Sequence, residues 1–196
     1  MASIFEGKAS LVSVEGDVVL SPGAVNRKKA VTETLVLELK TGLCLTVDES
    51  FSEHEGWAPY FGHMQPGWPS GQRWLIAKEK GLRDSWRISS ALLPQKYLTL
   101  KPQYKDRRSM VVLCSKSDSL TQCWKFILKN GSFRVQSCEG DCGVWDVGTA
   151  DTREERISWG REHDQWLWTW PVAHGDLHQQ FMLLESANIK CQRQSQ

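Results

Sequence analysis

Apolar and polar residues alternate over short stretches along most of this chain, which is the period-two pattern of half-buried β-strands. Turn residues separate these stretches, most clearly at Lys129-Asn130-Gly131-Ser132, a strong short hairpin signal. No apolar stripe is long enough for a helix of ordinary length. From Leu35 onward the alternation predicts three units of four short strands each. The predicted strands are 35–39, 43–47, a third in the loop with Trp57, Tyr60 and Phe61, and 73–78; then 86–89, 97–100, 110–114 and 123–128; then 133–136, 144–147, 166–170 and 180–184.

Each unit ends in a related sequence, and this repetition organises the chain. The three copies are Gln72-Arg73-Trp74, Gln122-Cys123-Trp124 and Gln179-Gln180-Phe181. Self-similarity at intervals of several tens of residues is typical of a chain built from repeated supersecondary units. Twelve short strands in three units predict an all-β domain that closes on itself, because closure removes exposed strand edges.

Composition and charge exclude several classes of function. The chain has 196 residues, of which 40% are hydrophobic, so it can bury a sizeable core in one domain. A formal net charge of +1 gives no electrostatic drive toward nucleic acid. No apolar run is long enough for membrane insertion, and the first residues lack the features of a secretory signal. We therefore expect a cytoplasmic protein.

Two further elements, at the second and third predicted strands of each unit, are similar between the units. The first of them is found at 42–47, 96–100 and 143–147, and the second at 60–63, 112–114 and 167–170. In this order, with a glutamine and an aromatic closing each unit, the chain resembles the ricin B-type, or R-type, β-trefoil lectin family. The resemblance implies that the closing residues are buried scaffold rather than a binding site. These residues are Gln72, Trp74, Gln122, Trp124, Gln179 and Phe181.

The resemblance spans about 35–184 and divides the chain into three parts. Residues 1–33 form an N-terminal extension that matches nothing later and contains a candidate hairpin. Residues 34–186 form the β-trefoil domain, and residues 187–196 form a C-terminal tail. The units of the domain span about 34–78, 83–128 and 132–185.

The resemblance also implies what the cysteines do. Secreted members of the family commonly pair the two cysteines of a unit. Here Cys44 has no partner near His63, and Cys114 has none near Tyr97. Half-lost pairs suit a reducing compartment, in line with the missing secretory signal.

We expect no metal, no cofactor and no catalysis. Cys138 and Cys142 could form half of a metal site, completed by Cys123 or His163, but recognisable zinc sites show two close pairs and no second pair exists. The alternative is that Cys138 and Cys142 are free thiols at a turn. The sequence also has no nucleophile elbow, no zinc-protease motif and no glycine-rich phosphate loop.

The family resemblance points to candidate site residues. A sugar site of this type needs an aspartate from the first element, an aromatic platform from the second, and a polar residue before the closing glutamine. An aromatic accepts the apolar face of a sugar ring, and a carboxylate accepts its hydroxyls. The third unit fits best, with Asp146, Trp168 and His178, and with Asp176 as a fallback. The second unit has Thr99, Leu113 and Thr121 at these places and fails, while the first offers a second candidate site at Asp48 and Phe61.

Tryptophan is the compositional outlier, with 10 residues in the chain. Trp166, Trp168 and Trp170 alternate and so project to one face of a strand. This stripe could pack in the core, or it could leave at least one ring exposed for a ligand. Both interpretations remain open at this point.

Two hypotheses for function follow. The first is a non-enzymatic carbohydrate-binding module with one dominant site in the third unit. Its partner is a glycan or glycoconjugate, and a homo-oligomer would add avidity. The alternative is an intracellular protein-interaction module, an inhibitor, scaffold or cytoskeletal binder, that contacts its partner through the loop from Trp57 to Trp68.

Overall fold

The computed structural model describes residues 31–47, 58–101, 109–140, 143–148, 165–171 and 177–185. Several predictions lie outside the described residues. These are the candidate hairpin of the extension, the tail 187–196, Asp48, Trp57 and Asp176.

The described residues form the twelve predicted strands, with boundaries that shift by up to three residues. Short 3-10 helices precede the last strand of each unit: η2 (Ser70–Gln72), η4 (Leu120–Gln122) and η5 (Leu177–Gln179). The strands are β1 (Thr32–Glu38), β2 (Cys44–Thr46), β3 (Tyr60–Gly62), β4 (Trp74–Lys78), β5 (Trp86–Ser90), β6 (Lys96–Lys101), β7 (Ser109–Ser115), β8 (Trp124–Lys129), β9 (Ser132–Ser137), β10 (Val144–Gly148), β11 (Gln165–Trp170) and β12 (Phe181–Glu185).

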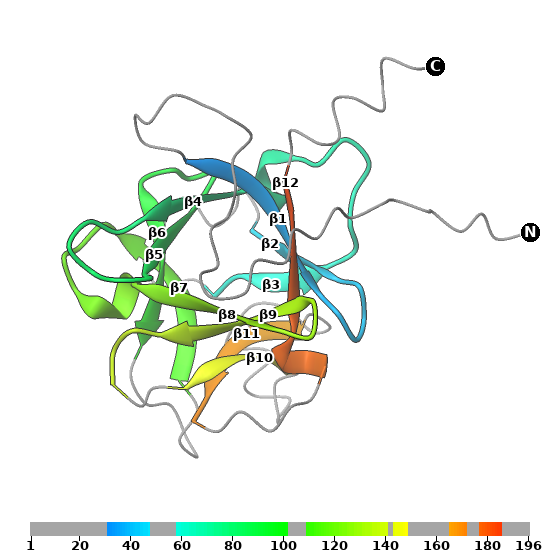
Figure 1. The fold of residues 1–196 in the computed structure, drawn as a ribbon. Helices are drawn as coiled ribbons and strands as arrows, with labels where there is room; N and C mark the ends of the chain where they lie inside the picture. Colours follow the sequence, from blue (N-terminus) through cyan, green and yellow to red (C-terminus); the bar gives the residue numbers. More distant parts are fainter. Residues whose placement is uncertain are drawn as a thin grey trace, which may run out of the picture.

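Six of the strands close into a barrel. Strand β1 pairs with β4, β4 with β5, β5 with β8, β8 with β9, β9 with β12, and β12 returns to β1. All of these pairings are antiparallel. Figure 1 shows the closure where the last strand, β12, lies beside the first, β1. Each unit contributes its first and fourth strand, so closure needs all three units.

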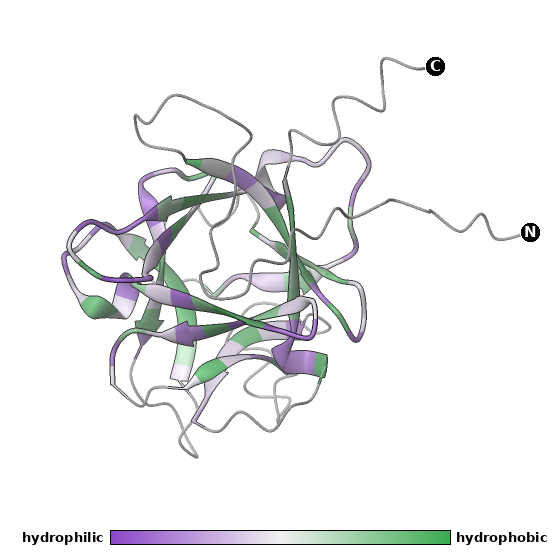
Figure 2. Ribbon diagram, in the orientation of Figure 1, coloured by the Kyte–Doolittle hydropathy of each residue, from purple (hydrophilic) through white to green (hydrophobic). Residues whose placement is uncertain are grey.

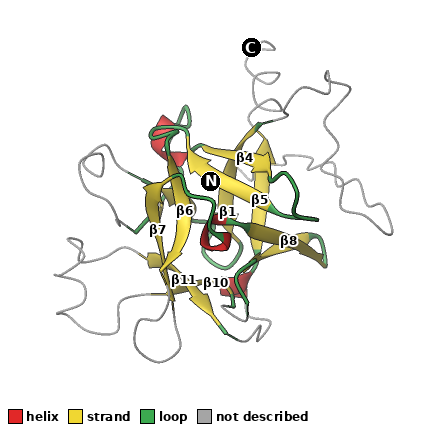
Figure 3. Ribbon diagram, turned by 90° about the vertical axis from the view of Figure 1, so that its left-hand side faces the viewer, coloured by secondary structure: helices red, strands yellow, loops and turns green. Residues whose placement is uncertain are grey.

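The other six strands form three hairpins, β2–β3, β6–β7 and β10–β11. Strand β11 joins them, because it pairs with β10, β3 and β7. Figure 3 shows strands on several sides of the molecule, with the short 3-10 helices between them. A six-stranded barrel capped by three hairpins, one from each unit, is the predicted all-β architecture.

Local sequence accounts for the tight turn between β8 and β9. Asn130 and Gly131 both have positive φ, 51° and 79°. A two-residue hairpin turn of this kind needs positive φ at both positions, and asparagine and glycine adopt it most readily. The predicted turn is therefore confirmed.

The hydrophobic core includes the aromatic residue that closes each unit. Trp74, Trp124 and Phe181 are all 0% exposed. The indole N–H of Trp74 donates to the carbonyl of Leu45 at 2.9 Å, and that of Trp124 donates to the carbonyl of Leu98 at 3.0 Å. Figure 2 shows the alternation of hydrophobic and hydrophilic positions along the strands around this core.

The third unit fills its share of the core differently. The Phe181 ring, unlike an indole, has no N–H to donate. Trp145 lies on the second strand of this unit, where the other units have leucine. The Trp145 ring meets Phe181 at a centroid distance of 5.6 Å and Trp124 at 5.3 Å, both edge to face. The larger aromatic has thus moved from the fourth strand to the second, which keeps the core filled.

Candidate functional site

The candidate site is best understood from the three closing glutamines, which occupy equivalent places. In the first unit the Gln72 amide Nε2 donates to the Thr46 hydroxyl at 3.2 Å and to the His63 carbonyl at 2.8 Å. Its Oε1 accepts from the Gln65 backbone N–H at 2.9 Å. The backbone just before Gln72 lies close to the end of β2. Only a glycine fits at position 71, because a Cβ there would lie 2.1 Å from the Val47 carbonyl oxygen.

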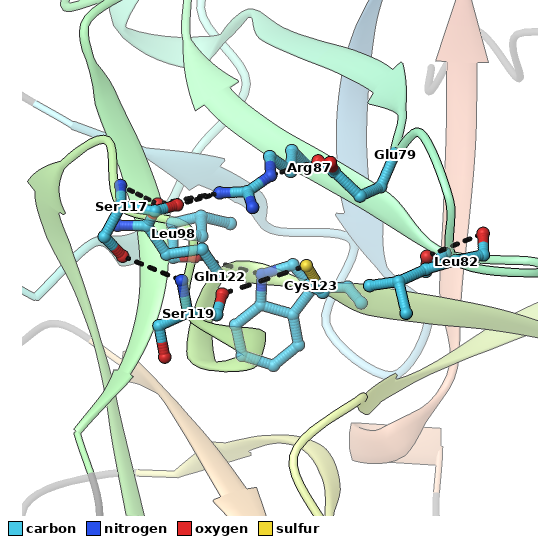
Figure 4. A network of polar contacts seen from close by, with 10 residues as sticks. Glu79, Leu82, Arg87, Leu98, Ser117, Ser119, Gln122 and Cys123 are labelled. Carbon is cyan, nitrogen blue, oxygen red and sulfur yellow. Dashed lines mark hydrogen bonds and ion pairs between the residues drawn. The ribbon is translucent and has the colours of Figure 1, made fainter.

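The second unit repeats this arrangement and adds a cation. The Gln122 amide donates to the Thr99 hydroxyl at 3.0 Å, and its Oε1 accepts from the Ser117 N–H at 2.8 Å. The buried Arg87 also donates to Gln122 Oε1 at 3.1 Å, as well as to the Ser117 carbonyl, and its Nε pairs with Glu79. Figure 4 shows Arg87 between Glu79 on one side and Gln122 and Ser117 on the other.

The third unit places a carboxylate where the other two have a hydroxyl. Gln179, 0% exposed, donates from Nε2 to Asp146 Oδ2 at 2.9 Å. The hydroxyls of Thr46 and Thr99 also donate to backbone carbonyls, at 2.7 and 2.9 Å, so each is held within its own strand. A carboxylate has about four acceptor positions and can accept several hydrogen bonds at once. Asp146 is partly exposed and is the anionic member of the three.

His178 contacts the first unit. Its Nδ1 lies 3.2 Å from Oε1 of Glu38, a carboxylate that is 0% exposed. The backbone N–H groups of Lys40 and Thr41 also donate to Glu38, at 2.9 and 2.8 Å, so the β1–β2 turn satisfies the buried charge. Because Nδ1 faces Glu38, any contact from His178 to a ligand near Asp146 must use Nε2.

The structure corrects the expectation for Trp168. It pairs directly opposite Asp146 across β10 and β11, so the two predicted residues are neighbours. However, Trp168 is only 3% exposed and Trp166 only 1%. A stacking platform must present a ring face to the sugar, and a ring this buried does not. The core interpretation of the stripe therefore describes Trp166 and Trp168, whereas Trp170 is partly exposed.

Phe61 is corrected for the same reason. It is 2% exposed, and its ring packs against Phe181 at a centroid distance of 6.0 Å, so it belongs to the core. The first unit nevertheless has a cleft of about 130 Å³ beside Thr46 and Gln72. Its lining includes Val47, the last described residue before Asp48.

Sequence reasoning missed Glu38 and Arg87, the two buried charges of this region. Glu38 occupies an inward position of an alternating strand, which is an unusual place for a carboxylate. That position was the available signal, since buried acidic residues are rare unless paired. Arg87 had no comparable signal, because its partner Gln122 is 35 residues away.

Neither a metal site nor a membrane span is found in the part of the chain that the structure describes. No group of three His, Cys, Asp or Glu side chains there is arranged to hold a metal ion. Cys142 and His163, the remaining candidates from the sequence, lie outside that part. Among the same residues, no helix has the length and apolar character to cross a bilayer.

The sequence matches no protein-family model, and no curated protein is similar to it in sequence. Solved structures are similar in fold. A mosquitocidal holotoxin matches with a TM-score of 0.63 at 14% identity, over 80% of this chain and 17% of the toxin. ThreeFoil, a designed 3-fold symmetric protein, matches at 0.58 and 17% identity, over 78% of this chain and 97% of the design.

A lectin from Polyporus squamosus, solved with a sialylated epitope, matches at a TM-score of 0.59 and 13% identity. This match covers 79% of the chain and 49% of the lectin, so the chain spans only part of the length of the lectin and of the toxin. Identities this low bear on the fold alone. Together with the closed barrel and its three hairpins, they show that this chain has the β-trefoil fold.

Proposed function

We propose that the chain is a non-enzymatic carbohydrate-binding module whose dominant site is centred on Asp146. The observation that carries the proposal is the substitution pattern at the three equivalent places. Two are neutral hydroxyls held within their own strands, and the third is a partly exposed carboxylate held by Gln179 at 2.9 Å.

The chemistry of this place suits a sugar. A carboxylate oriented by a buried amide is a fixed acceptor, and adjacent hydroxyls of one sugar ring can donate to both of its oxygens. Fixing the carboxylate in advance lowers the conformational entropy lost on binding. The lectin from Polyporus squamosus shares this fold and was solved with a sialylated glycan, which supports a glycan as the class of ligand.

The remaining site residues have different roles in the proposal. Trp168 is the buried neighbour of Asp146 across the β10–β11 hairpin. His178 reaches the ligand through Nε2, and Asp176 is an additional acceptor. In the first unit, Asp48 and the cleft beside Thr46 form a weaker second site.

Affinity at one such site is expected to be modest. A single shallow sugar site binds on the order of millimolar, or about 4 kcal/mol. Useful avidity then comes from a homo-oligomer or from a multivalent glycoconjugate.

Exchange of Asp146 for asparagine tests the proposal. Asp146→Asn keeps an oxygen that can accept from Gln179, so the fold is retained while the charge is lost. Asp118→Asn, on an exposed loop of the second unit, is the matched control for net charge. We expect a glycan array to yield ligands for the untagged protein, and calorimetry to show at least roughly tenfold weaker binding for Asp146→Asn only. No binding across a broad array, or equal binding by both variants, would refute the proposal.

A second candidate function is protein binding through the loop from Trp57 to Trp68. In the described part of this loop Met64 is 49% exposed, and Trp68 is partly exposed with a φ of 54°. Exposed methionine and tryptophan side chains are typical of protein contact surfaces. Affinity capture that yields a stoichiometric protein partner lost in Met64→Ala, with an empty glycan array, would favour this candidate over the first.

A further inference from the structure

Two free cysteines from different units face each other at the end of the β8–β9 hairpin. Cys123 directly precedes β8, and Cys138 directly follows β9. Trp124 and Ser137 are the neighbouring pair in the ladder, so the two cysteines are the next residues in register. The backbone N–H of Cys138 donates to the carbonyl of Cys123 at 2.9 Å. One backbone hydrogen bond therefore joins the pair beyond the end of the ladder, while the Cys123 N–H donates to the Leu120 carbonyl at 2.9 Å.

The register places the two side chains within reach of each other. Residues directly opposite in an antiparallel ladder project to the same face. Directly opposite residues in an antiparallel ladder have Cα atoms about 4.5 to 5.5 Å apart. Disulfides span Cα separations of about 4.4 to 6.8 Å, so the pair can be bridged without moving the backbone far.

The thiol environments differ in access. Cys123 is 0% exposed, whereas Cys138 is partly exposed. Burial raises the pKa of both thiols, and in Cys138 the neighbouring Cys123 contributes to the rise. Both groups are therefore mainly protonated at neutral pH, and Cys138 is the one that a dissolved reagent can reach first.

We propose that Cys123 and Cys138 form a reversible disulfide that responds to small-molecule disulfides such as oxidised glutathione. In the first step the Cys138 sulfur attacks the small disulfide, forms a mixed disulfide and releases one small thiol, which takes the Cys138 proton. In the second step the Cys123 sulfur attacks the Cys138 sulfur and displaces a second small thiol, which takes the Cys123 proton. The protein loses two hydrogens, and one small disulfide is reduced to two thiols.

The spacing of the two strand ends favours a reversible disulfide over a permanent one. The Cβ atoms of directly opposite residues lie about 4.5 to 5.5 Å apart, whereas a relaxed disulfide prefers about 3.8 Å. The bridge therefore draws the strand ends together and is more easily reduced than an unstrained one. It also fixes the start of β8 to the segment leading to β10, since Ser137 N–H donates to the Gly143 carbonyl at 3.2 Å.

Mass spectrometry and thermal unfolding of the full chain test this inference, independently of any sugar binding. After equilibration with oxidised glutathione, we expect an intact-mass loss of two hydrogens and a cross-linked peptide pair containing Cys123 and Cys138. We expect the oxidised protein to have a Tm several degrees higher, and dithiothreitol to reverse both changes.

Single substitutions distinguish this pair from its competitors. Cys138→Ser should abolish the cross-link, as should Cys123→Ala, which avoids a buried hydroxyl. Cys142→Ser and Cys114→Ser should leave the cross-link intact. Oxidation that stops at a mixed disulfide on Cys138, or a Cys138 to Cys142 link in the native protein, would overturn the proposal.

Discussion

The exchange of aromatics in the third unit can be tested by reversing it. In the first two units a leucine on the second strand faces a tryptophan on the fourth, whereas the third unit has Trp145 and Phe181. The double substitution Trp145→Leu with Phe181→Trp would give the third unit the pattern of the other two. Because both residues are fully buried and in ring contact, the two changes should be strongly coupled.

Each single change should be costly. Trp145→Leu leaves a cavity and removes two edge-to-face contacts, for an expected loss of about 2 to 4 kcal/mol. Phe181→Trp forces a larger ring against Trp145 and should cost about 1 to 3 kcal/mol by overpacking. If the two changes were independent, the double variant would lose about 3 to 7 kcal/mol.

The double variant should lose much less than this sum. A tryptophan at position 181 can fill the space left at position 145, and its indole N–H can donate to the carbonyl there, worth about 1 kcal/mol. The buried Nε1 of Trp145, which has no acceptor among the described residues, is removed at the same time. We therefore expect a total loss of only about 1 to 3 kcal/mol and a coupling of at least about 1 kcal/mol.

Urea unfolding of the wild type, both single variants and the double variant measures this coupling. Circular dichroism is the probe, because the single variants differ from the wild type in their number of tryptophans and so in fluorescence. Trp124→Phe is the control that isolates the indole hydrogen bond, here to the Leu98 carbonyl at 3.0 Å. Additive losses within about 0.5 kcal/mol would refute the idea that the two residues compensate for each other.

Two further predictions concern the buried polar groups. Gln122→Ala removes hydrogen bonds to Thr99, Ser115, Ser117 and Arg87. It should lower the free energy of unfolding by about 2 to 6 kcal/mol in the same urea assay. The control Lys125→Ala, on the exposed face of β8, should change that free energy by less than about 0.5 kcal/mol. Burial raises the pKa of the Cys44 thiol from 9.0 to about 12. The folded state therefore holds this proton more tightly than the unfolded state does. The corresponding part of the free energy of unfolding is lost as the pH rises from 9.0 toward 12. Cys44→Ala should therefore show a shallower fall in urea midpoint above pH 9.0 than the wild type, and parallel curves would contradict this.

The strand pattern and the threefold repetition were readable from sequence because both are local. Alternation of apolar and polar residues depends on neighbours along the chain, and the repeated glutamine and aromatic mark where each unit ends. The resemblance assigned Asp146 and Trp168 to one site, and the two residues are opposite each other in the pairing of β10 with β11. Long-range contacts could not be predicted from the sequence. The approach of Arg87 to Gln122 depends on how the second unit folds, and that of His178 to Glu38 depends on how the barrel closes.

The burial of Trp168 shows why alternation alone could not distinguish platform from core. In a sheet with one face in solvent, the alternation along each strand separates exposed from buried positions. Strand β11 is instead paired with three other strands, and its four central residues are all buried, on both faces. Three tryptophans two residues apart therefore gave no information on exposure. The aspartate differs from the tryptophans in this respect, because a carboxylate in place of two equivalent hydroxyls changes the chemistry of one unit while the glutamine bond is kept in all three.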